Sequence, residues 1–355
     1  MKQRLAAPIL SWFLPLWHLL ATLLFLLLVV PTAWLAGWAG LRKRRSEPRI
    51  VFGATPMINS KYHSRALRKV GLDSTTVVRG YHLSINTRQD FDIIFGIVDP
   101  SWSRWRRWYT RLLDVYVQFA KLLWQRDVFF YYFDGFYLRR GGPLRWLEVP
   151  ALKLLGKRVV AMPYGADMVT AADIPDVIRK YANARQYPSI ATNEALIHRQ
   201  IHHFTRWADA IVGGLAIGPD SLPRIDYLCP TFFAIDEGEW IPTYGPLRIV
   251  GDTLRVLHTP NHRIYKGTQF LIDAVEQLRG EGLNVELVLL ERVPNAEVRR
   301  IMAGCHVLAE QFMSGWYALS GQEGMASGKP VMCYIRPDLK RLFSLFSFGG
   351  ECPVV

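Results

Sequence analysis

The feature that most constrains the fold of this 355-residue chain is its N-terminal segment, in which no Asp, Glu, Lys or Arg occurs between Leu5 and Leu41. A helix of that length, at ~1.5 Å per residue, exceeds the ~30 Å hydrocarbon core of a bilayer. Pro15 and Pro31 leave two forms open, a tilted and kinked span or a re-entrant hairpin. A cleaved signal peptide would have a shorter apolar core. We therefore expect residues 1–45 to form a membrane anchor with a basic flank.

Positive charge is denser after this segment than before it. Lys2 and Arg4 precede the segment, and the residues that follow it at once are Arg42, Lys43, Arg44, Arg45 and Arg49. Basic flanks stay on the cytoplasmic side of a membrane. We therefore expect a membrane protein whose globular part lies on the cytoplasmic side.

Much of the net charge of +13 lies beside aromatic residues, in the stretches 102–111 and 136–146. Tryptophan with arginine suits a membrane interface, where rings lie at headgroup level and cations meet anionic lipid. Single-stranded nucleic acid binds similar patches, and a solvated helix face is a third interpretation. Because the anchor already holds the chain at a bilayer, we expect an anionic membrane surface as partner and no nucleic acid.

The rest of the composition, 50% apolar and 21% charged, is that of a globular protein longer than one typical domain. The four cysteines lie far apart without paired spacing, at Cys229, Cys305, Cys333 and Cys352. This pattern predicts buried thiols, neither a disulfide framework nor a zinc site. We expect no metal and no bound cofactor.

Apolar strand patterns alternate with helical patterns from residue 46 onward. Strands are expected at 49–54, 75–78, 92–95, 127–132, 158–162 and 209–212, and helices at 60–70, 109–124, 144–155 and 193–207. This alternation predicts a parallel sheet, with ligands at the carboxyl ends of the strands. We therefore expect a Rossmann-like domain over residues 46–235.

The loops at those strand ends supply candidate binding residues. They span residues 53–59, 132–135 and 163–167, and the polar or flexible positions singled out in them are Gly53, Asn59, Tyr164 and Asp167. Asp167 has an alternative interpretation as a helix N-cap.

A linker is expected at residues 236–250, because Pro242, Gly245 and Pro246 interrupt the pattern there. A second Rossmann-like domain over residues 251–355 then supplies strands at 254–257, 285–290, 306–308, 331–335 and 352–355. The chain therefore predicts an α/β protein with two Rossmann-like domains after an N-terminal membrane helix.

Residues 315–331, with the sequence GWYALSGQEGMASGKPV, combine a loop, a helix start and a buried strand. The free N–H groups and the dipole of a helix N-terminus attract anions such as a diphosphate. Glu323 near that mouth is expected to accept hydrogen bonds from ribose hydroxyls. A second strand, loop and helix follow the same plan at residues 254–279, with Arg263 and Lys266 in the loop as candidate phosphate-binding cations.

Together the two segments resemble the donor site of glycosyltransferases with the GT-B fold, of the family-4 type (glycosyl transferases group 1), in the membrane-anchored bacterial form. The family's usual signature reads Glu-Gly-Phe-Gly-Leu, three residues, Glu-Ala-Met-Ala, one residue and Gly-Lys-Pro-Val. The residues that fall on this register are Tyr317, Ala318, Leu319, Glu323, Met325, Ala326, Gly328, Lys329, Pro330 and Val331.

The resemblance implies a metal-independent, retaining transfer of a sugar from a nucleotide-diphosphate donor. The second domain would bind the nucleotide sugar, and the first would hold a lipid-linked or glycan acceptor, as in polysaccharide or glycolipid assembly. Lys266 inherits the role of neutralising the diphosphate, and Arg263 assists it. The other donor-site positions implied are Gly267, Gly315, Tyr317, Ala318, Leu319 and Ser320.

This sequence departs from the family at three places. Gly315 stands where the family carries a sugar-contacting Glu, so Glu310 or Gln311 takes over that role or the sugar is held differently. Tyr164 replaces the His of a His-Gly-Ser-Asp turn, which makes Asp167 the polar residue of interest there. The family continues with further helices, so the second domain is expected to be C-terminally incomplete, either as a truncated product or as an open-edged domain that a protein partner completes. These departures favour an alternative, a non-catalytic nucleotide-sugar-binding or scaffold subunit.

Overall fold

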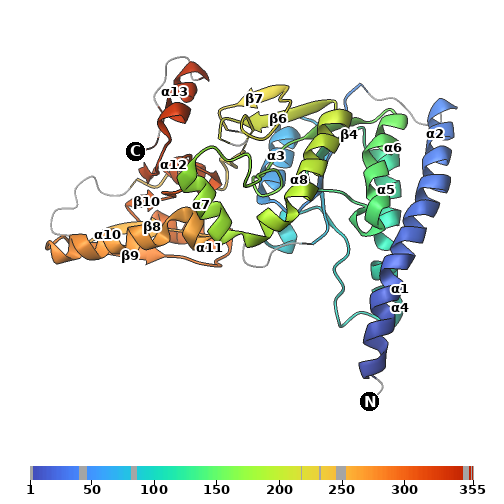
Figure 1. Cartoon of the computed structure of the whole chain (residues 1–355), viewed down its shortest axis with the longest axis horizontal. Coiled ribbons are helices and arrows are strands. Elements are labelled where there is room, and N and C mark those ends of the chain that lie inside the picture. The colour runs from blue at the N-terminus through green and yellow to red at the C-terminus, as the bar shows by residue number, and fades with distance from the viewer. Residues whose placement is uncertain are drawn as a thin grey trace. The chain divides into compact units, whose positions relative to one another are not determined.

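The structure is a computed structural model (Figure 1) that describes residues 3–39, 46–80, 86–216, 218–231, 233–244 and 253–346, together with 352 and 354. Three predicted features fall partly or wholly outside the described residues. They are the basic flank at 42–45, the end of the linker at 245–250 and the last strand at 352–355.

Two sheets form the framework, and every strand pairing described in them is parallel. The first has the order β3-β2-β1-β4-β5-β6-β7, with β1 Ile50–Ala54, β2 Ser74–Val78, β3 Ile93–Ile94, β4 Val128–Tyr131, β5 Arg158–Ala161, β6 Ala210–Gly214 and β7 Tyr227–Cys229. The second has the order β11-β10-β8-β9, with β8 Leu254–His258, β9 Val285–Leu289, β10 Val307–Ala309 and β11 Val331–Met332. The predicted α/β class with parallel sheets is confirmed.

Helices connect these strands. Those that lie between strands of the first sheet along the chain are α3 Ile58–Lys69, α4 Arg104–Leu112, α5 Asp114–Gln125, the 3-10 segment η3 Arg139–Leu147, α6 Glu148–Leu154, α7 Val177–Gln186 and α8 Pro188–Trp207. Those of the second are α9 Arg263–Lys266, α10 Thr268–Gly280, α11 Asn295–Ala303, α12 Leu319–Ala326 and α13 Pro337–Phe346. The interior strand β1 is buried along its whole length, as expected for an apolar strand covered on both faces.

The chain divides into two compact units. The first unit holds residues 1–81, 88–167 and 199–211, and the second holds residues 82–87, 168–198 and 212–355. The predicted domains follow the chain without exchange, at 46–235 and 251–355, whereas the compact units exchange segments. Residues 168–198, which contain α7, group with the C-terminal sheet.

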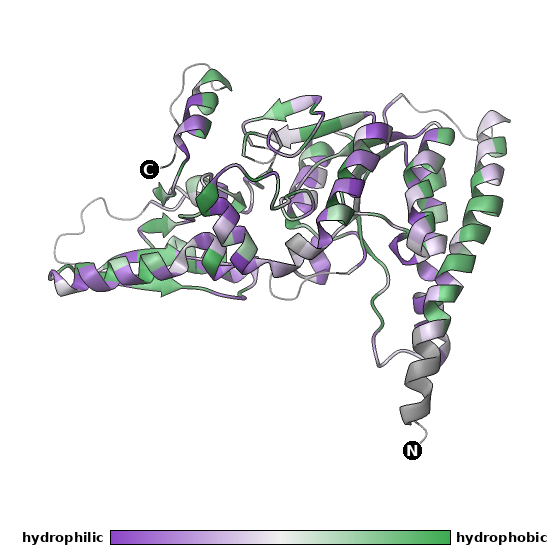
Figure 2. Ribbon diagram, viewed as in Figure 1, coloured by the Kyte–Doolittle hydropathy of each residue, from purple (hydrophilic) through white to green (hydrophobic). Residues whose placement is uncertain are grey.

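The apolar N-terminal segment forms one helix without a turn, through α1 Gln3–Leu24, the π-helical stretch Phe25–Val29 and α2 Val30–Trp38. Within the described residues, one helix is long and apolar enough to cross a membrane, over Trp12–Trp38 with a mean hydropathy of 2.4. Figure 2 shows its apolar residues along α1 and α2. A re-entrant hairpin would need a turn inside this segment, and the helix has none there.

Two predicted helices differ from those observed. The helix expected at 109–124 is two helices, α4 and α5, because Ser103 caps the first at its N-terminus and the helix breaks at Leu113. The helix expected at 144–155 begins as the 3-10 segment η3, whose Gly142 has a φ of 58°, and only α6 is α-helical. Helix α7 and strand β7 are additional to the prediction.

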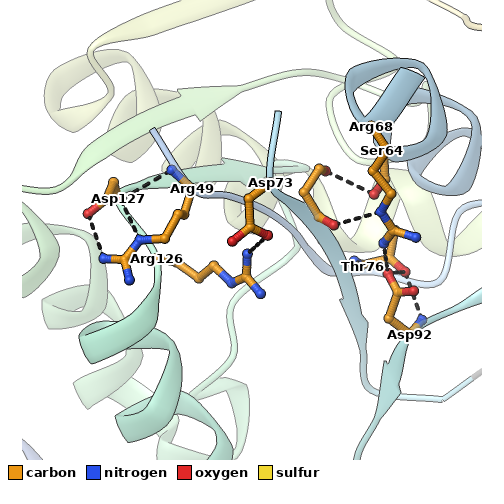
Figure 3. A network of polar contacts seen from close by, with 9 residues as sticks. Arg49, Ser64, Arg68, Asp73, Thr76, Asp92, Arg126 and Asp127 are labelled. Carbon is orange, nitrogen blue, oxygen red and sulfur yellow. Dashed lines mark hydrogen bonds and ion pairs between the residues drawn. The ribbon is translucent and has the colours of Figure 1, made fainter. Parts of the chain in front are cut away.

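Ion pairs fasten the amino ends of the first sheet's strands (Figure 3). Arg49, next to β1, donates from Nε to Asp127 Oδ2 at 2.9 Å, next to β4. Asp92 precedes β3 and accepts from the main-chain N–H of Thr76 in β2 at 2.8 Å and from the Arg68 guanidinium of α3. These contacts join neighbouring strands near their amino ends. The loops that follow the carboxyl ends of the strands take no part in them.

We predict that Asp92→Ala lowers the free energy of unfolding by about 1–3 kcal/mol, because the buried N–H of Thr76 loses its acceptor. Burial acts to raise the pKa of Asp92, but hydrogen bonds from Thr76 and Arg68 outweigh it and hold that pKa below its usual value. The stabilisation is therefore present above the unfolded-state pKa and lost as the pH falls through the folded one.

Urea unfolding of the full chain in detergent measures both effects, at neutral pH and below pH 4. Glu297→Ala, which removes an exposed pair with Arg300 on α11, is the matched control and should cost much less than Asp92→Ala, because solvent screens an exposed pair. Equal losses in the two variants would contradict the assignment of Asp92.

Candidate functional site

The carboxyl edge of the second sheet is organised by His258, the last residue of β8. Its ring is fully buried, with Nδ1 2.7 Å from the Ala309 carbonyl oxygen and Nε2 2.9 Å from the Thr268 hydroxyl. Because a carbonyl only accepts, Nδ1 carries the proton and Nε2 accepts from Thr268. Burial lowers the pKa of His258, which keeps the ring neutral. The ring thus ties β8 to the end of β10 and to the start of α10.

Lys266 ends the short helix α9, just before α10. Gly267 separates the two helices with a φ of 70°, and a Cβ there would lie 3.1 Å from Cβ of Phe312. Glycine is therefore required for the turn and for the close approach of the chain after β10. The turn directs the Lys266 side chain inward, where it is buried.

Glu310 follows β10 and has a fully buried side chain. Its carboxylate pairs with Nζ of Lys266. It also accepts from Oγ of Ser320 at 2.7 Å and from the main-chain N–H of Ala318 at 3.3 Å. Ala318 is the N-cap of α12 and Ser320 lies in its first turn. Four of the predicted site residues, Lys266, Glu310, Ala318 and Ser320, therefore meet at one point.

This point is an anion site at the N-terminus of a helix, filled by a carboxylate of the chain itself. A free N–H group, a hydroxyl and a lysine ammonium surround the carboxylate, which is the set of donors expected for a phosphate oxygen. The Cys333 thiol lies 3.6 Å from the second oxygen of Glu310, and burial raises the pKa of that thiol. The site is therefore closed by protein on the side of the sheet.

Arg263, on the same short helix as Lys266, is directed elsewhere. Its guanidinium forms two hydrogen bonds with the Glu291 carboxylate, at 2.7 and 2.6 Å, and is half exposed. Glu291 follows β9, so the pair joins two loops at the carboxyl edge. The charge of Arg263 is balanced by the Glu291 carboxylate, whereas that of Lys266 is balanced by Glu310.

Glu323 lies in the second turn of α12 rather than at its mouth. It is buried, and Nδ2 of Asn295, the first residue of α11, donates to its Oε1 at 3.0 Å. Burial raises the pKa of Glu323 to about 8, against the opposing effect of the Asn295 hydrogen bond. The carboxyl group is thus mostly protonated at neutral pH, when it both donates and accepts hydrogen bonds.

The absence of a side chain at Gly315 has a steric cause. Its φ is 80°, and a Cβ would lie 2.7 Å from Cγ of Arg336, whose own N–H donates to the Gly315 carbonyl at 2.9 Å. A glutamate at this position would have a strained backbone, and its Cβ would collide with the Arg336 side chain. Tyr317 is likewise buried, stacked on Trp316 at 4.8 Å between ring centroids, and Leu319 starts α12 beside them. Gly315, Tyr317 and Leu319 therefore determine the conformation and packing of the loop that leads into α12.

In the first unit, the three loops predicted from the strand ends do meet. Asp134, after β4, accepts from the Thr55 hydroxyl after β1 at 2.7 Å and from the Tyr164 hydroxyl after β5 at 3.3 Å. Asp167 is buried and accepts three main-chain N–H groups, from Phe133 at 3.0 Å, Tyr164 at 3.0 Å and Gly165 at 2.9 Å.

Burial and the nearby Asp134 raise the pKa of Asp167 to about 7. Its hydrogen bonds join the loop after β4 to the loop after β5, which is a structural use of the carboxylate. Asn59 is buried in α3 next to Ser60, whose hydroxyl contacts that of Tyr132 at 3.2 Å. Gly53 lies in β1, where a Cβ would collide with the hydroxyl of Tyr137.

Sequence reasoning missed three residues that determine this geometry, namely Asn295, Arg336 and Asp134. Asn295 directly follows Pro294, the N-cap of α11, so a helix start was readable there. The partners of Arg336 and Asp134 lie on other elements, and spacing carries no signal for them.

No protein-family model and no curated protein matches the chain. A similar solved structure is the catalytic domain of starch synthase IV from Arabidopsis thaliana bound to ADP and acarbose, with 12% identity, 81% of this chain and 83% of that chain covered, and a TM-score of 0.47. Another is sucrose-phosphate synthase from Thermosynechococcus elongatus, with 11% identity, 80% and 81% covered, and a TM-score of 0.46. A third is a UDP-glucosyltransferase from Polygonum tinctorium, with 10% identity, 86% and 84% covered, and a TM-score of 0.37.

At TM-scores below 0.5 and identities of 10–12%, these likenesses assign neither a fold type nor a residue role. The two parallel sheets and the N-terminal apolar helix of the structure itself agree with the predicted α/β class.

Lys266 and Glu310 should show strong energetic coupling. Lys266→Met alone leaves a buried carboxylate without its cation, and we expect it to lower the free energy of unfolding by about 3–5 kcal/mol. Adding Glu310→Gln to Lys266→Met should recover much of that loss, because no uncompensated charge remains. A double-mutant cycle in urea measures the coupling. Additive losses would show that the two side chains do not depend on each other.

Proposed function

We propose that the chain is a membrane-anchored, metal-independent retaining glycosyltransferase of the family-4 type. It transfers a sugar from a nucleotide-diphosphate donor, held by the second unit, to a lipid-linked or polysaccharide acceptor at the cytoplasmic face of a bacterial inner membrane. The observation that carries this proposal is the convergence of Lys266, Ser320 Oγ and Ala318 N–H on one buried carboxylate at the start of α12.

In the donor complex, the diphosphate takes over these donors from Glu310. A diphosphate carries more negative charge than one carboxylate, and it gains from the same N–H, hydroxyl and ammonium groups. Glu323 is buried in the second turn of α12. Its protonated carboxyl group offers hydrogen bonds to the ribose hydroxyls. The nucleotide therefore runs from the mouth of α12 toward Asn295.

Transfer breaks the bond between the anomeric carbon and the diphosphate oxygen, and the leaving diphosphate keeps the electron pair. The acceptor hydroxyl bonds to the same face of the sugar, and its proton passes to the departing diphosphate. Lys266 and the α12 N-terminus stabilise the charge that accumulates on that group. In the first unit, Asp167 and Asp134 hold the acceptor-side loops in place.

One observation favours a second candidate, a non-catalytic nucleotide-sugar-binding subunit. The sugar-contacting Glu of the resembled family has no counterpart at Gly315, where Arg336 leaves no room for a side chain. Such a subunit would bind the nucleotide sugar and release it unchanged.

A thermal-shift panel of nucleoside diphosphates and nucleotide sugars, on the full chain in detergent, tests the proposal. A ligand at ~100 times its Kd adds roughly 2.7 kcal/mol to stability. Release of nucleoside diphosphate from the stabilising sugar donor then separates enzyme from binding subunit. Binding without turnover in the presence of membrane extract supports the subunit, and no stabilisation by any nucleotide contradicts both.

We predict that Glu310→Gln tightens nucleoside diphosphate binding by about tenfold or more, because the competing charge is gone and Lys266 is released, with charge-assisted bonds worth about 1.5–3 kcal/mol. Isothermal titration calorimetry measures the change, and Glu297→Gln on the exposed face of α11 is the control. Weaker binding in Glu310→Gln would mean that the carboxylate positions Lys266 rather than competes with the diphosphate.

Glu323→Gln should change how stability depends on pH. The raised pKa of about 8 means that the folded state holds a proton that the unfolded state releases near pH 4.5. The parent therefore loses stability as the pH rises from about 4.5 to about 8, by at most about 1.4 kcal/mol per pH unit. Glu323→Gln removes this loss, so its melting temperature should exceed that of the parent more at pH 8 than at pH 5. Parallel pH profiles would contradict the buried, protonated state of Glu323.

A further inference from the structure

The N-terminal helix is not an isolated rod. It contacts α4 and η3 of the first unit, and α4 lies beside it in Figure 1. The side chains that it buries form a single stripe, made of His18, Thr22, Phe25 and Val30. Phe25 stacks on Phe119 of α5, with 5.5 Å between ring centroids. The helix is therefore docked on a folded domain between His18 and Val30.

Polar contacts fix the middle of the docked face. The hydroxyl of Tyr116, in α5, donates to the His18 carbonyl at 2.9 Å and lies 3.1 Å from both Nδ1 of His18 and Oγ1 of Thr22. Nε1 of Trp17 donates to the Leu112 carbonyl, at the end of α4, at 3.0 Å. We call these contacts the polar latch. They satisfy the polar groups near the centre of an otherwise apolar helix.

The approach at this point is close. A Cβ added to Gly141 of η3 would collide with the side chain of Thr22. Glycine therefore lets η3 lie directly against the Thr22 side chain. Buried hydrogen bonds and a contact this close indicate a specific interface, since an anchor that only tethers a domain needs neither.

The opposite face of the helix is apolar and exposed. Its exposed large side chains are Trp12, Phe13, Leu16, Leu19, Leu20, Leu23, Leu24, Leu27, Leu28, Trp34, Leu35 and Trp38. Tryptophan stands at both ends of this row and leucine fills the middle. In the segment Trp12–Trp38, 27 residues long, a helix extends about 40 Å at ~1.5 Å per residue.

The elements on which the N-terminal helix docks carry exposed basic residues. Helix α4 has the sequence RWRRWYTRL, with four arginines and no acidic residue, and Trp105 in it is 77% exposed. Lys121 on α5 and both Arg139 and Arg140 on η3 are also exposed. If the docked helix crossed a bilayer upright, these charges would be carried toward the hydrocarbon core, which is costly. If it undocked in order to cross, the polar latch would be lost.

We propose that this helix lies in the plane of one leaflet of an anionic bilayer, docked on its own domain, and does not cross the membrane. The leucine row enters the acyl region, the tryptophans lie at headgroup level, and the arginines of α4 meet anionic headgroups. The bilayer thus receives one continuous surface formed by the helix and the first unit together.

The two ends of the helix decide between the arrangements. Single cysteines are introduced by Gln3→Cys at the first residue of the helix and by Ser46→Cys after it, and each protein is reconstituted in sealed vesicles of phosphatidylcholine and phosphatidylglycerol. A membrane-impermeant maleimide is added outside, with the parent chain as the blank for its native cysteines. Where the labelled fraction of Ser46→Cys differs from one half, an in-plane helix gives the same fraction for Gln3→Cys, whereas a crossing helix gives the complementary one. Fractions that sum to the whole, one site high and the other low, overturn the proposal.

A variant without the polar latch tests whether these contacts keep the helix from crossing the bilayer. Tyr116→Phe with Gly141→Leu removes the hydroxyl and fills the close contact, so the freed helix should cross and the two fractions should become complementary. Thr32→Val, on the exposed face, is the control and should leave the fractions equal. Equal fractions in a folded latch variant would overturn the role of the latch, and the parent measurement stands by itself if that variant fails to fold.

Flotation with vesicles that lack phosphatidylglycerol tests the charge component. Binding of Arg104→Gln with Arg106→Gln and Arg111→Gln should fall several-fold relative to the parent on anionic vesicles and match it on neutral ones. Equal binding on anionic vesicles would remove the arginines of α4 from the surface.

Discussion

A buried carboxylate must be compensated from several sides, and Glu310 receives that compensation from an ammonium, a hydroxyl and a main-chain N–H. The surrounding elements of the second sheet are set by this requirement. The turn at Gly267 directs Lys266 inward, and α12 starts where its first N–H groups reach the carboxylate. Desolvation makes the pair costly to break from one side. Only another anion that satisfies the same donors can replace Glu310 without that cost.

The two edges of a parallel sheet are used differently here. At the amino edge of the first sheet, ion pairs such as Arg49 with Asp127 join neighbouring strands near the surface. At the carboxyl edges, carboxylates are buried deeper and accept main-chain N–H groups, as Asp167 does. Burial of this kind raises the pKa of Asp167 and of Glu323 toward neutrality. Groups whose protonation can change near neutral pH therefore collect at the edges where ligands bind in such folds.

Strands such as β1 and β2 were predictable because each is a short run that is buried along its whole length. The position of Lys266 near a helix start also followed from local pattern. Its partner did not, because Glu310 lies 44 residues away in the chain. Helix α7 shows the limit most clearly, since its apolar Val177 is 78% exposed while its charged Arg179 is buried. Amphipathic pattern reports the buried face only where apolar residues fill it, and here they do not.

The polar latch also has a temporal side. The hydroxyl of Tyr116 lies 98 residues beyond His18 in the chain, and the first sheet must pair before α5 has a surface to present. At a synthesis rate of about 5–20 residues per second, the apolar helix emerges roughly 5–20 s before its docking partner. During that interval the helix meets the membrane or the insertion machinery alone. The final topology therefore depends on whether membrane insertion of the helix or folding of the first unit is faster. Slower translation between residues 40 and 116 would favour insertion.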